Sequence, residues 1–242
     1  MTSMTDMDLI DRTIYPQIPT EPDSKWLKEH ATPTDEELKF VHEHTSNKHP
    51  ELELGLMLLL KLFQYLHYFP NVTQLPPGIT ERIRTRMKLD GSVIAKYNVP
   101  NTLTRHYNLV CEYQGATPYG SEETDPVIES ILEDAARRVN DPADLLNIVI
   151  DALLKANQEL PAFSTLEDMT GTVRSRVHRA IFRSIEAMLS ESDTARLDKV
   201  MESNGPGQLS EWNLIKQPAA KPPFRTCANS SSAGKNCVRL RL

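Results

Sequence analysis

The chain has 242 residues, 39% of them hydrophobic and 25% charged, which is enough to bury one large core or two small ones. Its three cysteines form no C-x-x-C pair, which argues against a disulfide scaffold and against a structural zinc site. A formal net charge of −6 and an acidic N-terminus without an apolar signal core indicate a soluble cytoplasmic protein.

Apolar residues recur at three- and four-residue spacing along most of the chain, and runs of β-branched residues are nearly absent. This pattern predicts helices throughout. Residues 1–33 are punctuated by prolines and are expected to form an extended N-terminal arm. We expect this arm to rest Tyr15 and Trp26 on the body of the protein.

A first helical bundle is expected over residues 34–115. Thr34 and Glu37 form a capping box, in which each side chain satisfies a free backbone donor at a helix start. The most apolar run extends from about Glu51 to Tyr68. Because this run contains charged residues and stops at a proline, it predicts a buried helix rather than a membrane span. A short basic helix, "ERIRTRMK", and a helix from Asn101 that a glycine terminates complete the bundle.

A second bundle is expected over residues 120–203. "DPVIESILEDAARRVN" and "DPADLLNIVIDALLKANQ" predict two helices with proline in the first turn, where its missing N–H is not needed. Ser164 and Glu167 form a second capping-box pattern before a long helix, which Gly171 either kinks or divides. "SESDTARLDKVME" predicts a last short helix. Residues 204–242 have no hydrophobic period, so we expect a linker and an irregular tail.

These elements predict an all-α fold of two consecutive small helical bundles, each ending on a basic segment. Acidic residues outnumber basic ones in residues 1–80 and 114–160, and the balance reverses in residues 81–113 and 171–184. Helix-turn-helix modules are built in a similar way, with the DNA-reading helix late in a small bundle.

Side chains of the basic segment 171–184 separate into two faces on a helix of about 100° per residue. One face is apolar and is expected to be buried: Val173, Val177, Ala180, Ile181, Ile185 and Met188. The opposite face holds Thr172, Arg176, Arg179 and Arg183, while Arg174 flanks the seam. Like charges at this spacing repel one another, so an external anion such as the DNA phosphate backbone would stabilise the arrangement.

The first bundle has a comparable basic region. Its short basic helix carries Arg82, Arg84, Arg86 and Lys88. In the next helix, side chains that point away from the apolar stripe are Thr104, Arg105 and Asn108. Arginine and asparagine are the residue types that read purine edges in the major groove. A charged helix face is also a common solvated surface, so charge alone leaves DNA binding and a plain solvated face as equal alternatives.

Three stretches occur in order along the chain: "LGLMLLLKLFQYLHYFP", "LTRHYNLVCEYQGATPYG" and "LPAFSTLEDMTGTVRSRVHRAIF". Together they resemble the N-terminal region of Tn-three-type replicative transposases, over roughly residues 13–222. The resemblance implies an all-helical, multi-part module that binds double-stranded DNA at the terminal inverted repeats of a transposon. The resemblance places the protein at the nucleoid of a bacterial cell. Because the sequence shows no phosphate loop, nucleophile elbow or metal cage, and no membrane span, we expect no cofactor, no small-molecule substrate and no membrane partner.

The resemblance puts DNA contacts on two groups of residues: Arg105 and His106 in the second stretch, and Arg174, Arg176, Arg179 and Arg183 in the third. Cys111 stands where many members have an arginine, which weakens the first site. Members of the family continue into an RNase H-like catalytic domain, whereas the resemblance here ends near Pro222. We therefore expect a frameshifted, non-catalytic fragment, with an intact transposase of the same element as a further partner.

Neither a catalytic site nor a metal site is predicted. His42 and His44 point about 200° apart on a helix, so one metal ion would not hold both. The densest acidic groups, "TDEEL" and "GSEETD", lie at helix starts, where carboxylates interact favourably with the helix dipole. The alternative to DNA binding is an inert or protein-interaction helical remnant whose faces serve only packing.

Overall fold

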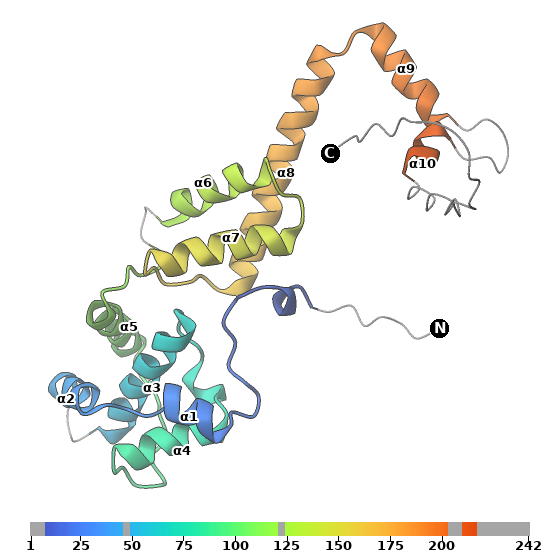
Figure 1. Ribbon diagram of the computed structural model, residues 1–242. Helices are drawn as coiled ribbons and strands as arrows, with labels where there is room; N and C mark the ends of the chain where they lie inside the picture. The colour runs from blue at the N-terminus through green and yellow to red at the C-terminus, as the bar shows by residue number, and fades with distance from the viewer. Residues whose placement is uncertain (1–7, 46–48, 121–123, 203–209, 217–242) are drawn as a thin grey trace, which may run out of the picture. The chain divides into compact units, whose positions relative to one another are not determined.

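The computed structural model describes residues 8–45, 49–120, 124–202 and 210–216 (Figure 1). Regular structure in these ranges consists of α-helices and two short 3-10 helices, without a strand; one isolated bridge pairs Thr117 with Gln158. The all-α prediction is therefore confirmed. Contacts divide the chain into two compact units, Met1–Ser184 and Ile185–Leu242. The boundaries predicted from the sequence for separate domains stay a prediction.

The N-terminal part of the first unit is built from short helices around one long one. They are η1 (Leu9–Arg12), α1 (Ser24–His30), α2 (Asp35–His44), α3 (Pro50–Leu66), η2 (Val72–Gln74), α4 (Pro77–Arg86) and α5 (Pro100–Gln114). Two of these, η1 and α1, lie where the sequence predicts an extended arm. The Asp23 side chain accepts a hydrogen bond from the Trp26 N–H at 2.7 Å and caps α1. This N-cap indicates a helix start, but the prolines in the same segment favour the prediction of an extended arm.

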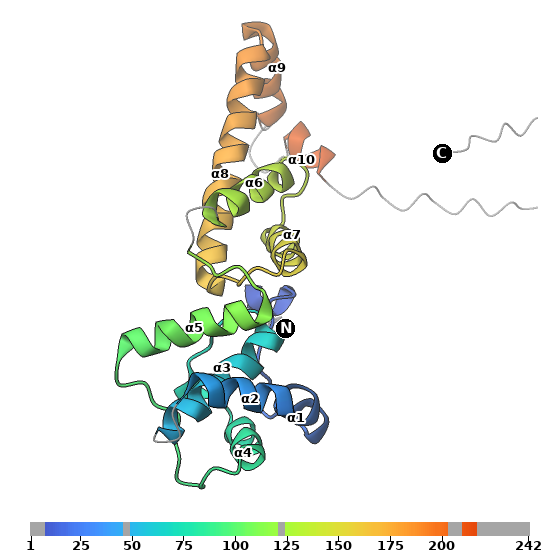
Figure 2. The ribbon, with the colours of Figure 1, turned by 90° about the vertical axis from the view of Figure 1, so that its left-hand side faces the viewer.

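Helix α3 forms the centre of the first hydrophobic core. Every residue from Glu53 to Phe63 is buried, and α1, α2, α4 and α5 surround the helix (Figures 1 and 2). An ideal Cβ on Gly55 would lie 2.7 Å from Tyr97 Oη, so this position of α3 accommodates the tyrosine only without a side chain. The predicted buried helix is confirmed.

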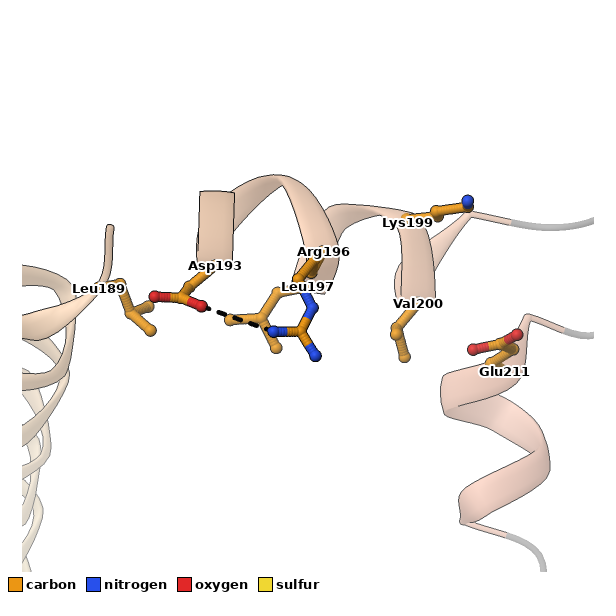
Figure 3. A pocket seen from close by; sticks show the side chains of 7 residues that line it. All are labelled: Leu189, Asp193, Arg196, Leu197, Lys199, Val200 and Glu211. Carbon is orange, nitrogen blue, oxygen red and sulfur yellow. Dashed lines mark ion pairs between the residues drawn. The ribbon is translucent and has the colours of Figure 1, made fainter. Parts of the chain in front are cut away.

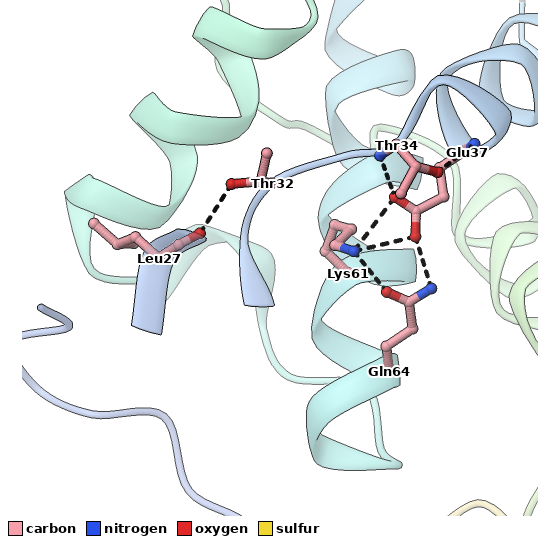
Figure 4. Close-up of polar contacts among 6 residues, drawn as sticks. All are labelled: Leu27, Thr32, Thr34, Glu37, Lys61 and Gln64. Atoms are coloured by element: carbon pink, nitrogen blue, oxygen red, sulfur yellow. Dashed lines mark hydrogen bonds and ion pairs between the residues drawn. The ribbon is translucent and has the colours of Figure 1, made fainter. Parts of the chain in front are cut away.

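A buried polar cluster fixes α2 against α3 (Figure 4). The Thr34–Glu37 capping box is present, as the sequence predicts. The Glu37 carboxylate also accepts from Lys61 Nζ at 3.1 and 3.3 Å and from Gln64 Nε2 at 2.8 Å. Lys61 Nζ also donates a hydrogen bond to Gln64 Oε1 at 2.7 Å. The charges of Glu37 and Lys61, both buried, are therefore paired with each other, as buried ions require.

The second hydrophobic core of the first unit lies among α6 (Thr124–Ala136), α7 (Pro142–Lys155) and α8 (Phe163–Met188). Tyr15 belongs to this core: its ring stacks on Tyr68 with centroids 5.1 Å apart, and its hydroxyl donates to the Pro161 carbonyl at 2.9 Å. The Leu160 N–H donates to the carbonyl of His67, at the end of α3, at 2.7 Å. The expectation that the N-terminal segment rests Tyr15 on the body is confirmed.

Helix α8 is one continuous helix that passes through Gly171, and Ser164 lies inside its first turn instead of capping it. Its predicted buried face is only half correct. Val173 and Val177 are buried, whereas every residue from Arg179 to Met188 is exposed, including the predicted face residues Ala180, Ile181, Ile185 and Met188. The second core ends at Val177, because α6 and α7 are only about half as long as α8.

The second unit contains α9 (Glu191–Met201) and α10 (Glu211–Ile215). Ser190 and Asp193 form a capping box at the start of α9. Helix α10 lies within the range predicted to be irregular, and the rest of that predicted tail falls outside the described residues. No helix in the described part of the chain is long and apolar enough to cross a membrane.

Candidate nucleic-acid interface

Basic side chains of α4 line a shallow hollow of about 690 Å3 beside α1. Arg82 Nε donates to Thr32 Oγ1 at 3.1 Å, and Arg86 forms an ion pair with Asp35 at the start of α2. Arg82, Arg84 and Lys88 all line the hollow, and so does the acidic Glu81. Arg84 Nε is buried without a hydrogen-bond partner in the described residues, and Lys88 is exposed at the turn that ends α4. Of the four predicted residues, Arg82 and Arg86 are thus committed to internal contacts and Lys88 is exposed. Arg84 is half-buried, and the pKa of Asp90 is lowered by hydrogen bonds from Ser92 and, to a smaller degree, by the Arg84 charge.

The predicted contacts on α5 divide into exposed and buried side chains. Thr104, Arg105 and Asn108 are all exposed. The Thr104 hydroxyl donates to the Pro100 carbonyl at 3.3 Å, and Arg105 has neither a hydrogen bond nor an ion pair within the described residues. This face of α5 therefore presents one free guanidinium and one amide to the solvent.

His106 lies on the opposite side of α5 and does not belong to this face. Its side chain is 3% exposed, and its Nδ1 lies 2.7 Å from the hydroxyl of Tyr97, the residue that packs over Gly55. Burial, with a smaller contribution from the Arg105 charge, lowers the pKa of His106 to about 4. We remove His106 from the candidate DNA contacts, because it is a neutral core residue. The family resemblance predicts His106 as a DNA contact, but its burial indicates that the histidine serves in the packing of the core.

Helix α8 presents a second exposed basic face. Thr172, Arg179 and Arg183 are exposed, and neither arginine has a hydrogen-bond or ion-pair partner among the described residues. Arg174 is half-buried and donates from Nε and Nη2 to Asn140 Oδ1 at 3.1 and 3.0 Å. Arg174 is thus held against the turn between α6 and α7, and Arg179 and Arg183 are the free cations of this helix.

Arg176 differs from its neighbours because it already has anionic partners. Its Nη2 lies 2.8 Å from Glu129 Oε2 and 2.8 Å from Glu133 Oε1, both on α6. The hydrogen bond and charge of Glu129, together with those of Glu133, raise the pKa of the guanidinium. The prediction of an arginine face without an internal anion is therefore wrong for Arg176. The two glutamates are spaced i, i+4, which in the sequence is the signal for one common acidic face on α6.

Other hollows and clusters do not coincide with the predicted DNA-binding residues. A hollow of about 640 Å3 in the second unit lies between α9 and α10, with an ion pair between Arg196 and Asp193 at 3.8 Å on its wall (Figure 3). Its lining includes none of the predicted residues. Nowhere in the described ranges do three His, Cys, Asp or Glu side chains come together as metal ligands would.

Comparison with known proteins agrees with the resemblance seen in the sequence. The chain is 24% identical over 211 residues to the transposase for transposon Tn1546 of Enterococcus faecium, with 85% of this chain and 21% of that protein covered. It is 20% identical over 201 residues to the transposase for transposon Tn501 of Pseudomonas aeruginosa, with 82% and 20% covered. The chain therefore spans about a fifth of the length of these relatives. The resemblance to transposases is confirmed.

A family model also matches the chain directly. It is described as a domain of unknown function, DUF4158, and it matches residues 7–173. The matched region includes both hydrophobic cores up to Val173 and all of the basic residues discussed on α4 and α5. Because this match covers more than half of the sequence, the chain belongs to the DUF4158 family.

Proposed function

We propose that this chain binds double-stranded DNA at the terminal inverted repeats of a transposon, as a non-catalytic region of a transposase. The observation that carries the proposal is a set of exposed cations without an internal partner in an otherwise acidic protein: Arg105 on α5, and Arg179 and Arg183 on α8. An external polyanion satisfies such side chains, and both named relatives are transposases.

The two exposed faces suit different parts of DNA recognition. Arg105 and Asn108 are one helical turn apart on α5, and both residue types form bidentate hydrogen bonds with purine edges in the major groove. Arg179 and Arg183 are likewise one turn apart on α8. Arg84 and Lys88 at the α4 hollow supply phosphate contacts, which fix the register of a protein on the duplex. In this arrangement α5 and α8 act as two recognition helices of the helix-turn-helix type.

In this proposal the chain acts at the bacterial nucleoid, and its second partner is an intact transposase of the same element. Binding to the same repeats makes the chain a competitor of that enzyme. We propose DNA binding without phosphodiester chemistry, because in the resembled family that chemistry belongs to the RNase H-like domain. Overexpression of the chain is expected to lower the transposition frequency of the element.

Charge reversal on α8 tests the proposal against a plain packing role. Arg179→Glu combined with Arg183→Glu is expected to reduce affinity for DNA by at least tenfold, because two phosphate contacts become repulsive. A variant with Lys39→Glu and Lys155→Glu, both exposed and outside the proposed DNA-binding faces, changes the net charge equally and is the matched control. Circular dichroism verifies that all variants remain helical. If both variants lose affinity equally, or neither does, α8 is not a DNA-binding face; absence of DNA binding by the helical wild type is the result that favours the remnant alternative.

A further inference from the structure

Arg176 is the one arginine of the exposed α8 face that already has two carboxylates beside it. We propose that Glu129 and Glu133 form an autoinhibitory contact, in which they occupy Arg176 in place of a DNA phosphate and hold down the affinity for DNA. The inference rests on the proposed DNA-binding function. It adds that α6 regulates the arginine face of α8, which neither the charge pattern nor the family resemblance indicates.

The charges of the three residues explain why the contact opposes DNA. Glu129 and Glu133 are one turn apart on α6, where like charges repel, and the guanidinium between them relieves this repulsion. The trio carries a net charge of −1, so a phosphate that approaches Arg176 meets negative charge instead of positive charge. When the Arg176 side chain leaves the two glutamates to bind DNA, the repulsion between their carboxylates returns.

The contact is weak enough to be displaced. The side chains of Arg176, Glu129 and Glu133 are 48%, 46% and 45% exposed, so water screens both ion pairs. Exposed pairs of this kind each shift an equilibrium by roughly threefold. Two such pairs therefore lower DNA affinity by about tenfold without blocking binding.

Arg176 has an alternative environment next to the carboxylates. It lines a shallow hollow of about 710 Å3 along α8, together with Thr172, Ser175 and Arg179. A phosphate in this hollow would receive two hydroxyl donors and two guanidinium groups. Glu167 and Asp168 line the same hollow nearer the start of α8 and discourage a phosphate from settling in that direction.

The test neutralises the two carboxylates with nearly isosteric amides. We measure fluorescence anisotropy of Glu129→Gln/Glu133→Gln on the inverted-repeat duplex and on a scrambled duplex, each over a salt series. We expect about tenfold tighter binding, and a salt slope steeper by about 0.9 because Arg176 joins the phosphate contacts. Asp11→Asn/Asp144→Asn removes two exposed carboxylates without a cationic partner in the described residues and is the matched control.

A cycle with Arg176→Gln identifies the route of the effect. In that background the Glu129→Gln/Glu133→Gln change is expected to leave the affinity unaltered, because the carboxylates act through Arg176. Unaltered or weaker binding by the neutralised variant overturns the autoinhibitory contact alone, and so does a gain equal to that of the control or one that persists without Arg176. No binding by either the wild type or the neutralised variant overturns the proposed function as well.

Discussion

Gly55→Ala tests the close contact between α3 and Tyr97, whose hydroxyl group in turn contacts His106 on α5. The added Cβ would lie 2.7 Å from Tyr97 Oη and 2.9 Å from two of its ring carbons. The ring does not yield easily, because its hydroxyl pairs with the buried Nδ1 of His106 at 2.7 Å. The substitution therefore forces either a steric overlap or the loss of that hydrogen bond.

The magnitude follows from these alternatives. Overpacking in a core costs about 1–3 kcal/mol, and leaving a buried polar atom unpaired costs about the same. The better helix propensity of alanine offsets up to about 1 kcal/mol. We expect Gly55→Ala to lower the free energy of unfolding by about 2 kcal/mol, which moves a urea midpoint by about 1 M.

Gly171→Ala is the matched control, because nothing lies within 4 Å of a Cβ at this position of α8. It is expected to raise the free energy of unfolding by about 0.5–1 kcal/mol through helix propensity alone. Urea unfolding is followed by the fluorescence of Trp26, which packs against the first core, in a Trp212→Phe background. Equal stability of the wild type and Gly55→Ala would refute the close approach of Tyr97 to α3.

Three further predictions concern buried polar groups. Because the pKa of His106 is lowered to about 4, the unfolded chain binds its proton first as pH falls, so stability drops between about pH 6.5 and 4; His106→Gln should flatten this part of a pH series of urea midpoints. Lys61→Met leaves the Glu37 carboxylate buried without its cation and should cost about 3–5 kcal/mol in urea unfolding. Tyr15→Phe leaves the Pro161 carbonyl without its donor and should cost about 1–3 kcal/mol, measured as a lower thermal midpoint of the circular-dichroism signal.

Local signals in the sequence account for much of the fold. The Thr34–Glu37 capping box depends on residues three positions apart, and the uninterrupted apolar run at positions 54–60 indicates that α3 is buried. The all-α class follows from the same local periodicity. The cap of α1 by Asp23 is equally local, but the prolines around it favour an extended interpretation.

The features that the sequence could not supply depend on contacts between distant elements. Amphipathic spacing shows that α8 has an apolar face, but it does not show how far another helix covers that face. Exposure of Ile181 and Ile185 results from the end of the core at Val177. Similarly, the burial of His106 depends on Tyr97 and the small Gly55, and the pairing of Arg176 depends on how α6 lies beside α8.

The most direct measurement of the central claim is the affinity of the intact chain for the inverted repeat that borders its gene, compared with a scrambled duplex, over a salt series. With Arg84, Lys88, Arg179 and Arg183 each neutralising one phosphate, we expect tighter binding to the repeat and a slope of log affinity against log salt of about −3.6. Equal affinity for the two duplexes would contradict sequence-directed recognition. A slope near zero would contradict the role of these cations altogether.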